Sequence, residues 1–68
     1  MFKEYEIVRL KRDVSGQGVF AGDVGVVVIV YDVSNHPRAY EVDFSNAEEK
    51  ELITVTLYEE DIEKIDEL

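Results

Sequence analysis

The sequence has no cysteine, no tryptophan, one proline and one histidine. Without cysteine the chain forms no disulfide bond and no thiolate metal site, and a single histidine does not make a His-based zinc site by itself. The longest apolar run, residues 26–31, is far shorter than a membrane span. Residues 1–6 have no apolar signal-peptide core. We therefore expect a cytoplasmic protein that has no cofactor and no membrane association.

With 68 residues the chain is expected to be one domain, residues 1–68, of a size that buries only about 60% of its extended-chain surface. No disulfide adds stability, so stability must come from a tightly packed β core or from self-association. A hydrophobic content of 46% is typical of a folded globular protein.

Seven basic and sixteen acidic residues give a formal net charge of −9. The imbalance lies entirely in residues 41–68, because the charges of residues 1–40 cancel. Nucleic acids and anionic membranes are bound through basic patches, so this distribution argues against both as partners. It favours a basic protein partner. The alternative is that the acids serve only solubility.

Alternation of apolar and polar residues predicts an all-β fold with strands at residues 4–12, 24–32, 38–44 and 51–57. All four glycines fall within residues 16–25 and predict a long loop with a turn at Ala21-Gly22-Asp23. Further polar turns are expected at residues 34–37 and 45–50.

The C-terminal tail has two interpretations. A turn at residues 58–61 followed by a closing strand at 62–65 is the one we favour, because five strands could close a barrel and remove the exposed sheet edges. Ile62, Ile65 and Leu68 also have the spacing of one helix face, which leaves a short helix as the alternative.

The strand at residues 24–32 is apolar on both faces. Val27, Ile29 and Tyr31 are expected to face away from the core, where they need cover from a loop, a terminus or another chain, so homodimerisation is an alternative. The predicted core is Val8, Leu10, Val26, Val28, Val30, Tyr40, Val42, Phe44, Ile53, Val55, Leu57 and Ile62.

Four segments carry a family resemblance: Val8-x-Leu10-x-Arg12-Asp13, Gly18-x-x-Ala21-Gly22-Asp23-x-Gly25-x-Val27, Tyr40-Glu41-Val42-x-Phe44 and Thr56-Leu57. In this order they resemble a family of very small bacterial and cyanobacterial proteins of unknown function. The resemblance covers nearly the whole chain and implies a five-stranded antiparallel SH3-like barrel, with a short helical turn near the C-terminus as a variant. Residues 14–17 depart from the Leu-Pro-type start of the family's loop.

The resemblance also bears on function. Family members are often encoded beside larger proteins, some of them toxin-like, which implies an antitoxin or immunity role. It implies no catalytic residues.

Motifs for chemistry are weak. Residues 16–21 satisfy a dinucleotide-binding pattern, but a valine strand follows them where a helix is needed. His36, Ser15, Ser34 and Ser45 lie in turn-like segments, without the strand-to-helix elbow of a serine hydrolase. The acidic runs at 48–49, 59–61 and 66–67 lack the glycine of a calcium loop. We therefore predict no catalytic, cofactor or metal site and no enzymatic activity.

The remaining candidate is a recognition surface. If the strands at residues 38–44 and 51–57 pair, the outward carboxylates of the first are expected beside the outward threonines Thr54 and Thr56 of the second. Three more acids, residues 59–61, follow the second strand. Tyrosines among charges are typical of interface centres. The predicted residues are Tyr31, Glu41, Asp43, Tyr58, Glu59, Glu60 and Asp61.

The leading hypothesis is a non-catalytic, antitoxin- or immunity-like module whose acidic C-terminal half engages a basic partner protein, such as a toxin encoded nearby. Two alternatives stay open. One is a structural or accessory subunit that binds through its valine strand or a sheet edge. The other is a nucleic-acid mimic that occupies the DNA site of a nuclease or repressor.

Overall fold

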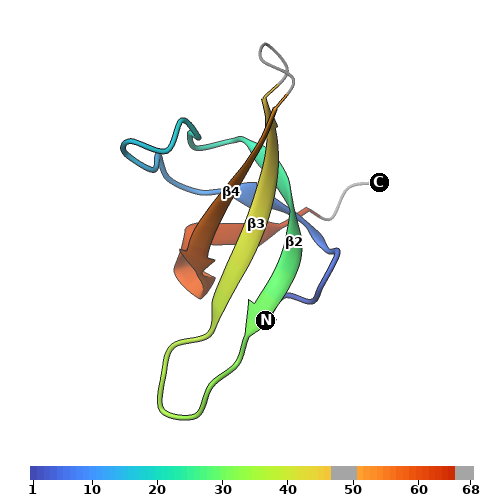
Figure 1. Cartoon of the computed structure of the whole chain (residues 1–68), viewed down its shortest axis with the longest axis vertical. Helices are drawn as coiled ribbons and strands as arrows, with labels where there is room; N and C mark the ends of the chain where they lie inside the picture. Colours follow the sequence, from blue (N-terminus) through green and yellow to red (C-terminus); the bar gives the residue numbers. More distant parts are fainter. Residues whose placement is uncertain (47–50, 66–68) are drawn as a thin grey trace.

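The structure is a computed structural model that describes residues 1–46 and 51–65 (Figure 1). Five antiparallel strands form one sheet: β1 Ile7–Leu10, β2 Val24–Tyr31, β3 Ala39–Asn46, β4 Glu51–Tyr58 and β5 Ile62–Lys64. A single 3-10 turn, η1 Glu59–Asp61, precedes β5. β-Branched and aromatic residues dominate the strands because they pack well on a pleated, half-buried surface. The predicted all-β class is confirmed.

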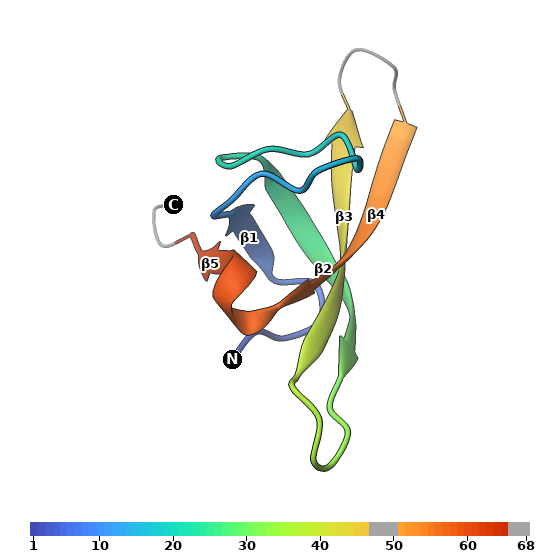
Figure 2. The ribbon, with the colours of Figure 1, turned by 90° about the vertical axis from the view of Figure 1, so that its left-hand side faces the viewer.

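The strand order is β4-β3-β2-β1-β5, so β4 and β5 are the two edges of the sheet. In Figure 2 the sheet twists and curls, so that β1 and β5 lie on one side of β2 and across from β3 and β4. The sheet is not closed, because η1 redirects the chain so that β5 pairs with β1 and not with β4. The described residues therefore form an open, curled sheet and not a hydrogen-bonded barrel.

The strand ends differ from the predicted ones for local reasons. β1 is shorter than residues 4–12, because the Glu6 amide donates to the Lys3 carbonyl at 3.1 Å and closes a turn. Ser45 and Asn46 belong to β3, whereas residues 47–50 of the predicted turn at 45–50 lie outside the described part. The hairpin turn at residues 34–37 is confirmed.

The C-terminal tail follows the favoured interpretation, a turn and then a strand. Leu68, which belonged to the helical alternative, lies outside the described residues, as does the acidic pair at 66–67. No helix in the described part of the chain has the length and apolar character needed to cross a membrane.

A β-bulge in β2 changes which side chains face the core. In the ladder between β2 and β3, Val27 pairs with Val42, but the next pair is Ile29 with Glu41. Val28 is therefore an extra residue on β2, and the inside–outside alternation changes phase at this point.

This bulge overturns part of the predicted core. Val27 is fully buried, whereas Val26 and Val28 are only half-buried. The prediction that Val26 and Val28 belong to the core and that Val27 faces outward is wrong, because uniform alternation does not allow for an extra residue. After the bulge, Val30 packs against the core as predicted.

The buried core lies in the concave side of the curled sheet, and its ten residues are Val8, Leu10, Val19, Val27, Tyr40, Val42, Phe44, Val55, Leu57 and Ile62. Eight of these were predicted, and Ile53 packs at the margin. Val19 was missed. It comes from the β1–β2 loop, where the Val14 amide donates to the Val19 carbonyl at 3.1 Å and brings this residue to the core.

Candidate protein-binding surface

The outward side chains of β2, β3 and β4 form one continuous surface, called here the outer face. Its members are Val26, Ile29, Tyr31, Ala39, Glu41, Asp43, Leu52, Thr54, Thr56 and Tyr58. Strand register arranges them in rows across the three strands, because directly paired residues in a sheet project to the same side. Four of the seven predicted site residues, Tyr31, Glu41, Asp43 and Tyr58, lie on this face.

Two neighbouring rows of the outer face place exposed apolar side chains around one carboxylate. Ile29, Glu41 and Thr56 form one row, and Tyr31 and Tyr58 flank Ala39 in the next. Ile29, Tyr31 and Tyr58 keep 43%, 41% and 43% of their surface exposed. Exposed aromatic side chains such as Tyr31 and Tyr58 belong to the residue types enriched at protein interfaces, which makes this face a candidate for recognition.

The two carboxylates of the outer face are held by threonines of β4. The Thr54 hydroxyl donates to Asp43 Oδ1 at 2.5 Å, and the Thr56 hydroxyl donates to Glu41 Oε1. These are the cross-strand neighbours predicted from alternation. Both carboxylates are thereby oriented on the face while keeping acceptor capacity for a ligand.

The η1 acids do not join this surface as one cluster. Asp61 is buried, and its carboxylate accepts hydrogen bonds from Arg12 Nε at 2.7 Å and from the Tyr58 amide at 2.9 Å. Burial disfavours the charged form of Asp61, but the hydrogen bonds from Arg12 and Tyr58 outweigh it and hold the Asp61 pKa below its ordinary value. In the described fold this carboxylate fixes the 3-10 turn.

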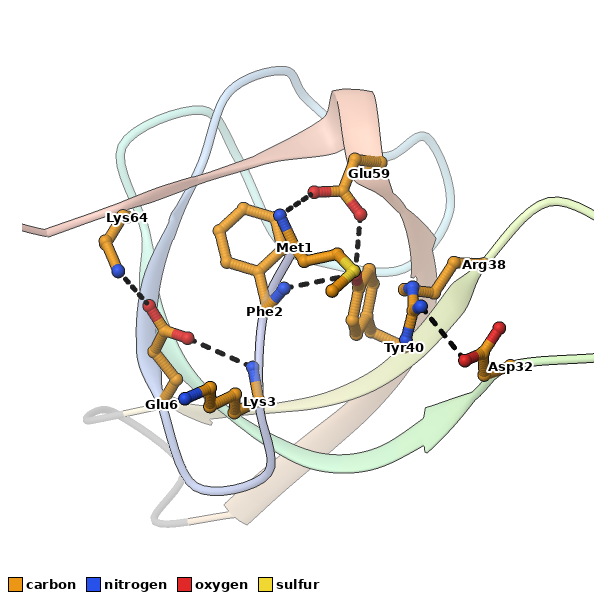
Figure 3. Close-up of polar contacts among 9 residues, drawn as sticks. All are labelled: Met1, Phe2, Lys3, Glu6, Asp32, Arg38, Tyr40, Glu59 and Lys64. Carbon is orange, nitrogen blue, oxygen red and sulfur yellow. Dashed lines mark hydrogen bonds and ion pairs between the residues drawn. The ribbon is translucent and has the colours of Figure 1, made fainter.

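Glu59 belongs to a second internal network, which lies where the N-terminal segment crosses the end of the sheet (Figure 3). Its carboxylate lies 2.8 Å from the Met1 amino group and accepts a hydrogen bond of 2.5 Å from the Tyr40 hydroxyl. These two contacts lower the pKa of Glu59. Burial, followed by the bond to Glu59, raises the pKa of Tyr40. The Phe2 ring packs edge-on against Tyr40 at 5.4 Å.

Folding also pairs some of the acids of the C-terminal half with cations from the N-terminal half. Cations of the N-terminal half neutralise acids of the C-terminal half: Arg9 Nη1 lies 3.3 Å from Glu63 Oε2, and Arg12 pairs with Asp61. Glu51 and Glu60 are exposed and have no salt bridge or side-chain hydrogen bond among the described residues. Among the described acids of residues 41–65, those open to a partner are therefore Glu41 and Asp43 on the outer face and Glu51 and Glu60 at the two ends of β4.

These internal carboxylates predict acid sensitivity. The folded-state pKa values of Glu59 and Asp61 lie below their ordinary values of 4.5 and 3.8. Their stabilisation is therefore complete above the ordinary values and is lost as the pH falls through the lower folded values. We expect the urea midpoint to fall steeply between about pH 5 and pH 2. Glu59→Gln should flatten part of this fall, and a midpoint that stays constant over the range would contradict the assignment.

The residues considered for chemistry are dispersed. Gly16 and Gly18 lie with φ near 79° in the β1–β2 loop, which leads into β2 and not into a helix. His36 is exposed, and its amide closes the β2–β3 turn on the Val33 carbonyl at 3.1 Å. Among residues 1–46 and 51–65, no group of three or more potential ligands is placed to hold a metal ion. Glu48 and Glu49 lie outside the described residues.

Sequence reasoning missed two kinds of residue at this surface. Leu52, which is 69% exposed, extends the outer face along β4, and the alternation with Thr54 and Thr56 contained that signal. Arg12 and Tyr40 bind the η1 carboxylates from distant parts of the chain. No local pattern marks these long-range partners.

Comparison with known proteins gives one family. A family model described as "Domain of unknown function (DUF4926)" matches residues 4–64, which is nearly the whole chain. No curated protein and no solved structure gives a significant match.

Proposed function

The chain belongs to this family of unknown function, and we propose that it is a non-catalytic protein-binding module that engages a basic partner protein through its outer face. The observation that carries the proposal is the pair of rows on β2–β4 in which exposed Ile29, Tyr31 and Tyr58 flank the carboxylate of Glu41. Aromatic anchors supply contact area, and the carboxylates supply orientation and steering toward a positive surface.

The net charge of −9 supports the choice of a basic partner. An antitoxin or immunity role toward a basic toxin encoded nearby is the specific form we propose. A cytoplasmic location fits that form. We also propose kinship with SH3-like barrels, and the five antiparallel strands with one 3-10 turn before the last support it.

The test measures binding to the protein encoded beside this chain, co-expressed and purified with it. We expect the dissociation constant to rise with salt and Glu41→Lys and Glu60→Lys each to weaken binding by about tenfold at low salt. Glu4→Lys is the matched control: it makes the same charge change outside the five strands, and we expect less than about a twofold effect. Reversal of Glu59 or Asp61 is avoided because both have internal partners.

Two results would overturn the mechanism. Binding that is unchanged at high salt and in both reversal variants would assign the chain to the accessory-subunit class, in which the apolar groups alone make the contact. A reproducible turnover abolished by changing His36 would make the chain an enzyme.

A further inference from the structure

One edge of the sheet, β4, is long, and no other strand in residues 1–46 and 51–65 lies beside its open side. β4 spans eight residues and pairs only with β3. The other edge, β5, has three residues, two of them charged (Glu63 and Lys64). Short length and charge are the usual ways in which proteins keep a sheet edge from pairing with another chain. β5 has both features, whereas β4 is long and its one charged residue is Glu51, at its first position.

Known hydrogen bonds of β2 show which way the backbone groups of β4 point. The Val27 amide donates to the Glu6 carbonyl at 3.0 Å, and the Val27 carbonyl accepts from the Tyr5 amide at 2.5 Å. Both groups of Val27 therefore point toward the β1 side and away from β3. Val27 and Val42 are then a non-hydrogen-bonded pair, so the backbone groups of Val42 point toward β4.

The same alternation carries across to β4. Val42 pairs with Val55, so Val55 directs its amide and carbonyl to β3. Its neighbours Thr54 and Thr56 direct theirs to the open side. The Tyr58 amide fits this phase, because it donates to Asp61 Oδ2 and not to β3. Figure 2 shows the first half of β4 at the margin of the ribbon.

The composition of β4 suits strand pairing. Residues 52–58, Leu-Ile-Thr-Val-Thr-Leu-Tyr, contain no charge, proline or glycine, and the register with β3 has no bulge. A seven-residue uncharged segment rich in β-branched and aromatic residues pairs readily with another strand when its edge is open. Residues 52–58 therefore have neither the charge nor the proline that usually protects a sheet edge.

Charge at the ends of β4 decides between occupants. Glu51 begins the strand, and Glu59 and Glu60 follow it. Antiparallel pairing with a second copy would place Glu51 of one chain beside Glu59 and Glu60 of the other, and like charges disfavour it. A strand with an uncharged middle and basic ends is complementary at both ends.

We propose that β4 binds an extended segment of a partner protein by strand addition, with Lys or Arg at the ends of that segment opposite Glu51 and Glu60. This inference rests on the proposed function, and it names how the basic partner binds. Main-chain hydrogen bonds from Leu52, Thr54 and Thr56 supply affinity, and the terminal acids select basic flanks.

The test uses a synthetic probe peptide, Lys-Lys-Val-Thr-Val-Thr-Val-Lys-Lys, titrated into the isotopically labelled 68-residue chain. We expect the amide signals of Leu52, Thr54 and Thr56 to shift and their hydrogen exchange to slow. Thr54→Pro removes an edge amide outside the β3 ladder, and we expect at least about tenfold weaker binding. Thr54→Val is the matched control, since it removes the hydroxyl but keeps the amide, and its affinity should stay close to that of the parent chain.

Two modified peptides test strand addition even if the Thr54→Pro variant does not fold. The same peptide with alternate amides N-methylated should lose binding, and a version with glutamates in place of lysines should bind at least about tenfold more weakly.

Equal binding of the parent chain and a folded Thr54→Pro variant would overturn strand addition, while sensitivity to Glu41→Lys would keep the proposed function. If neither the neighbouring protein nor any basic peptide bound, both would be wrong. A dimer in sedimentation that Thr54→Pro dissolves would assign the edge to a second copy.

Discussion

Gly25→Ala is expected to destabilise the protein by about 3 kcal/mol, which is close to the whole stability of a domain of this size. A methyl group at Gly25 would lie 2.8 Å from the Asp43 carbonyl oxygen and 2.8 Å from side-chain carbons of both Val42 and Phe44. The oxygen belongs to the β3 backbone, so relief requires opening the ladder between β2 and β3. This glycine is needed for space, since its φ lies outside the left-handed region.

The measurement is thermal unfolding, where we expect the midpoint to fall by about 15 °C. Val24→Ala is the control on the neighbouring residue, because Val24 is exposed and its truncation should change the free energy of unfolding by less than about 0.5 kcal/mol. If Gly25→Ala and the parent chain had the same unfolding midpoint, β3 could move away from the added methyl group without loss of stability. The outer face would then have a less rigid support than its geometry indicates.

The alternation in β3 and β4 predicted these strands well because each has one buried and one solvated face. Tyr40, Val42 and Phe44 are buried, while Glu41 and Asp43 project outward. In such a strand a shift of one residue would bury charge, so the pattern fixes the orientation. The predicted neighbours of Glu41 and Asp43 on β4 followed from the same reasoning and are confirmed.

The prediction of which β2 side chains face the core was wrong for the opposite reason. Valine or isoleucine occupies positions 26 to 30, so either phase buries apolar side chains and the sequence holds no penalty for a slip. The bulge at Val28 makes Val27 and Val30 both face the core, which no uniform period describes. A glycine next to such a run predicts a turn. The close contact of Gly25 with β3 depends instead on tertiary packing, which the local sequence does not reveal.

The η1 acids show what adjacency in sequence does not reveal. Glu59, Glu60 and Asp61 form one acidic run, yet only Glu60 is exposed without an internal partner among the described residues. Asp61 reaches Arg12 across 49 positions, and Glu59 reaches Tyr40 across 19. These pairings follow from the order of the strands and not from spacing along the chain. The proposed binding surface therefore contains fewer acids than the charge distribution predicted.

Asp61→Asn is expected to destabilise the protein by about 2 kcal/mol. Both carboxylate oxygens accept hydrogen bonds, one from Arg12 and one from the Tyr58 amide, so an amide group at this position sets a donor against a donor. The site is buried, and water does not replace the lost bond at full strength. Urea unfolding at neutral pH measures the loss.

Two further readouts separate this role from a general loss of acidity. Glu60→Gln makes the same chemical change on the adjacent exposed residue, and we expect less than about 0.5 kcal/mol. Asp61→Asn should also flatten the fall in stability below about pH 5, because the carboxylate with the lowered pKa has been removed. Adding Arg12→Gln to Asp61→Asn should cost little more, since the partner of Arg12 is already lost. If Glu60→Gln matched Asp61→Asn in cost, the 3-10 turn would depend on net charge alone, and Asp61 would have no special role in joining β4 to β5.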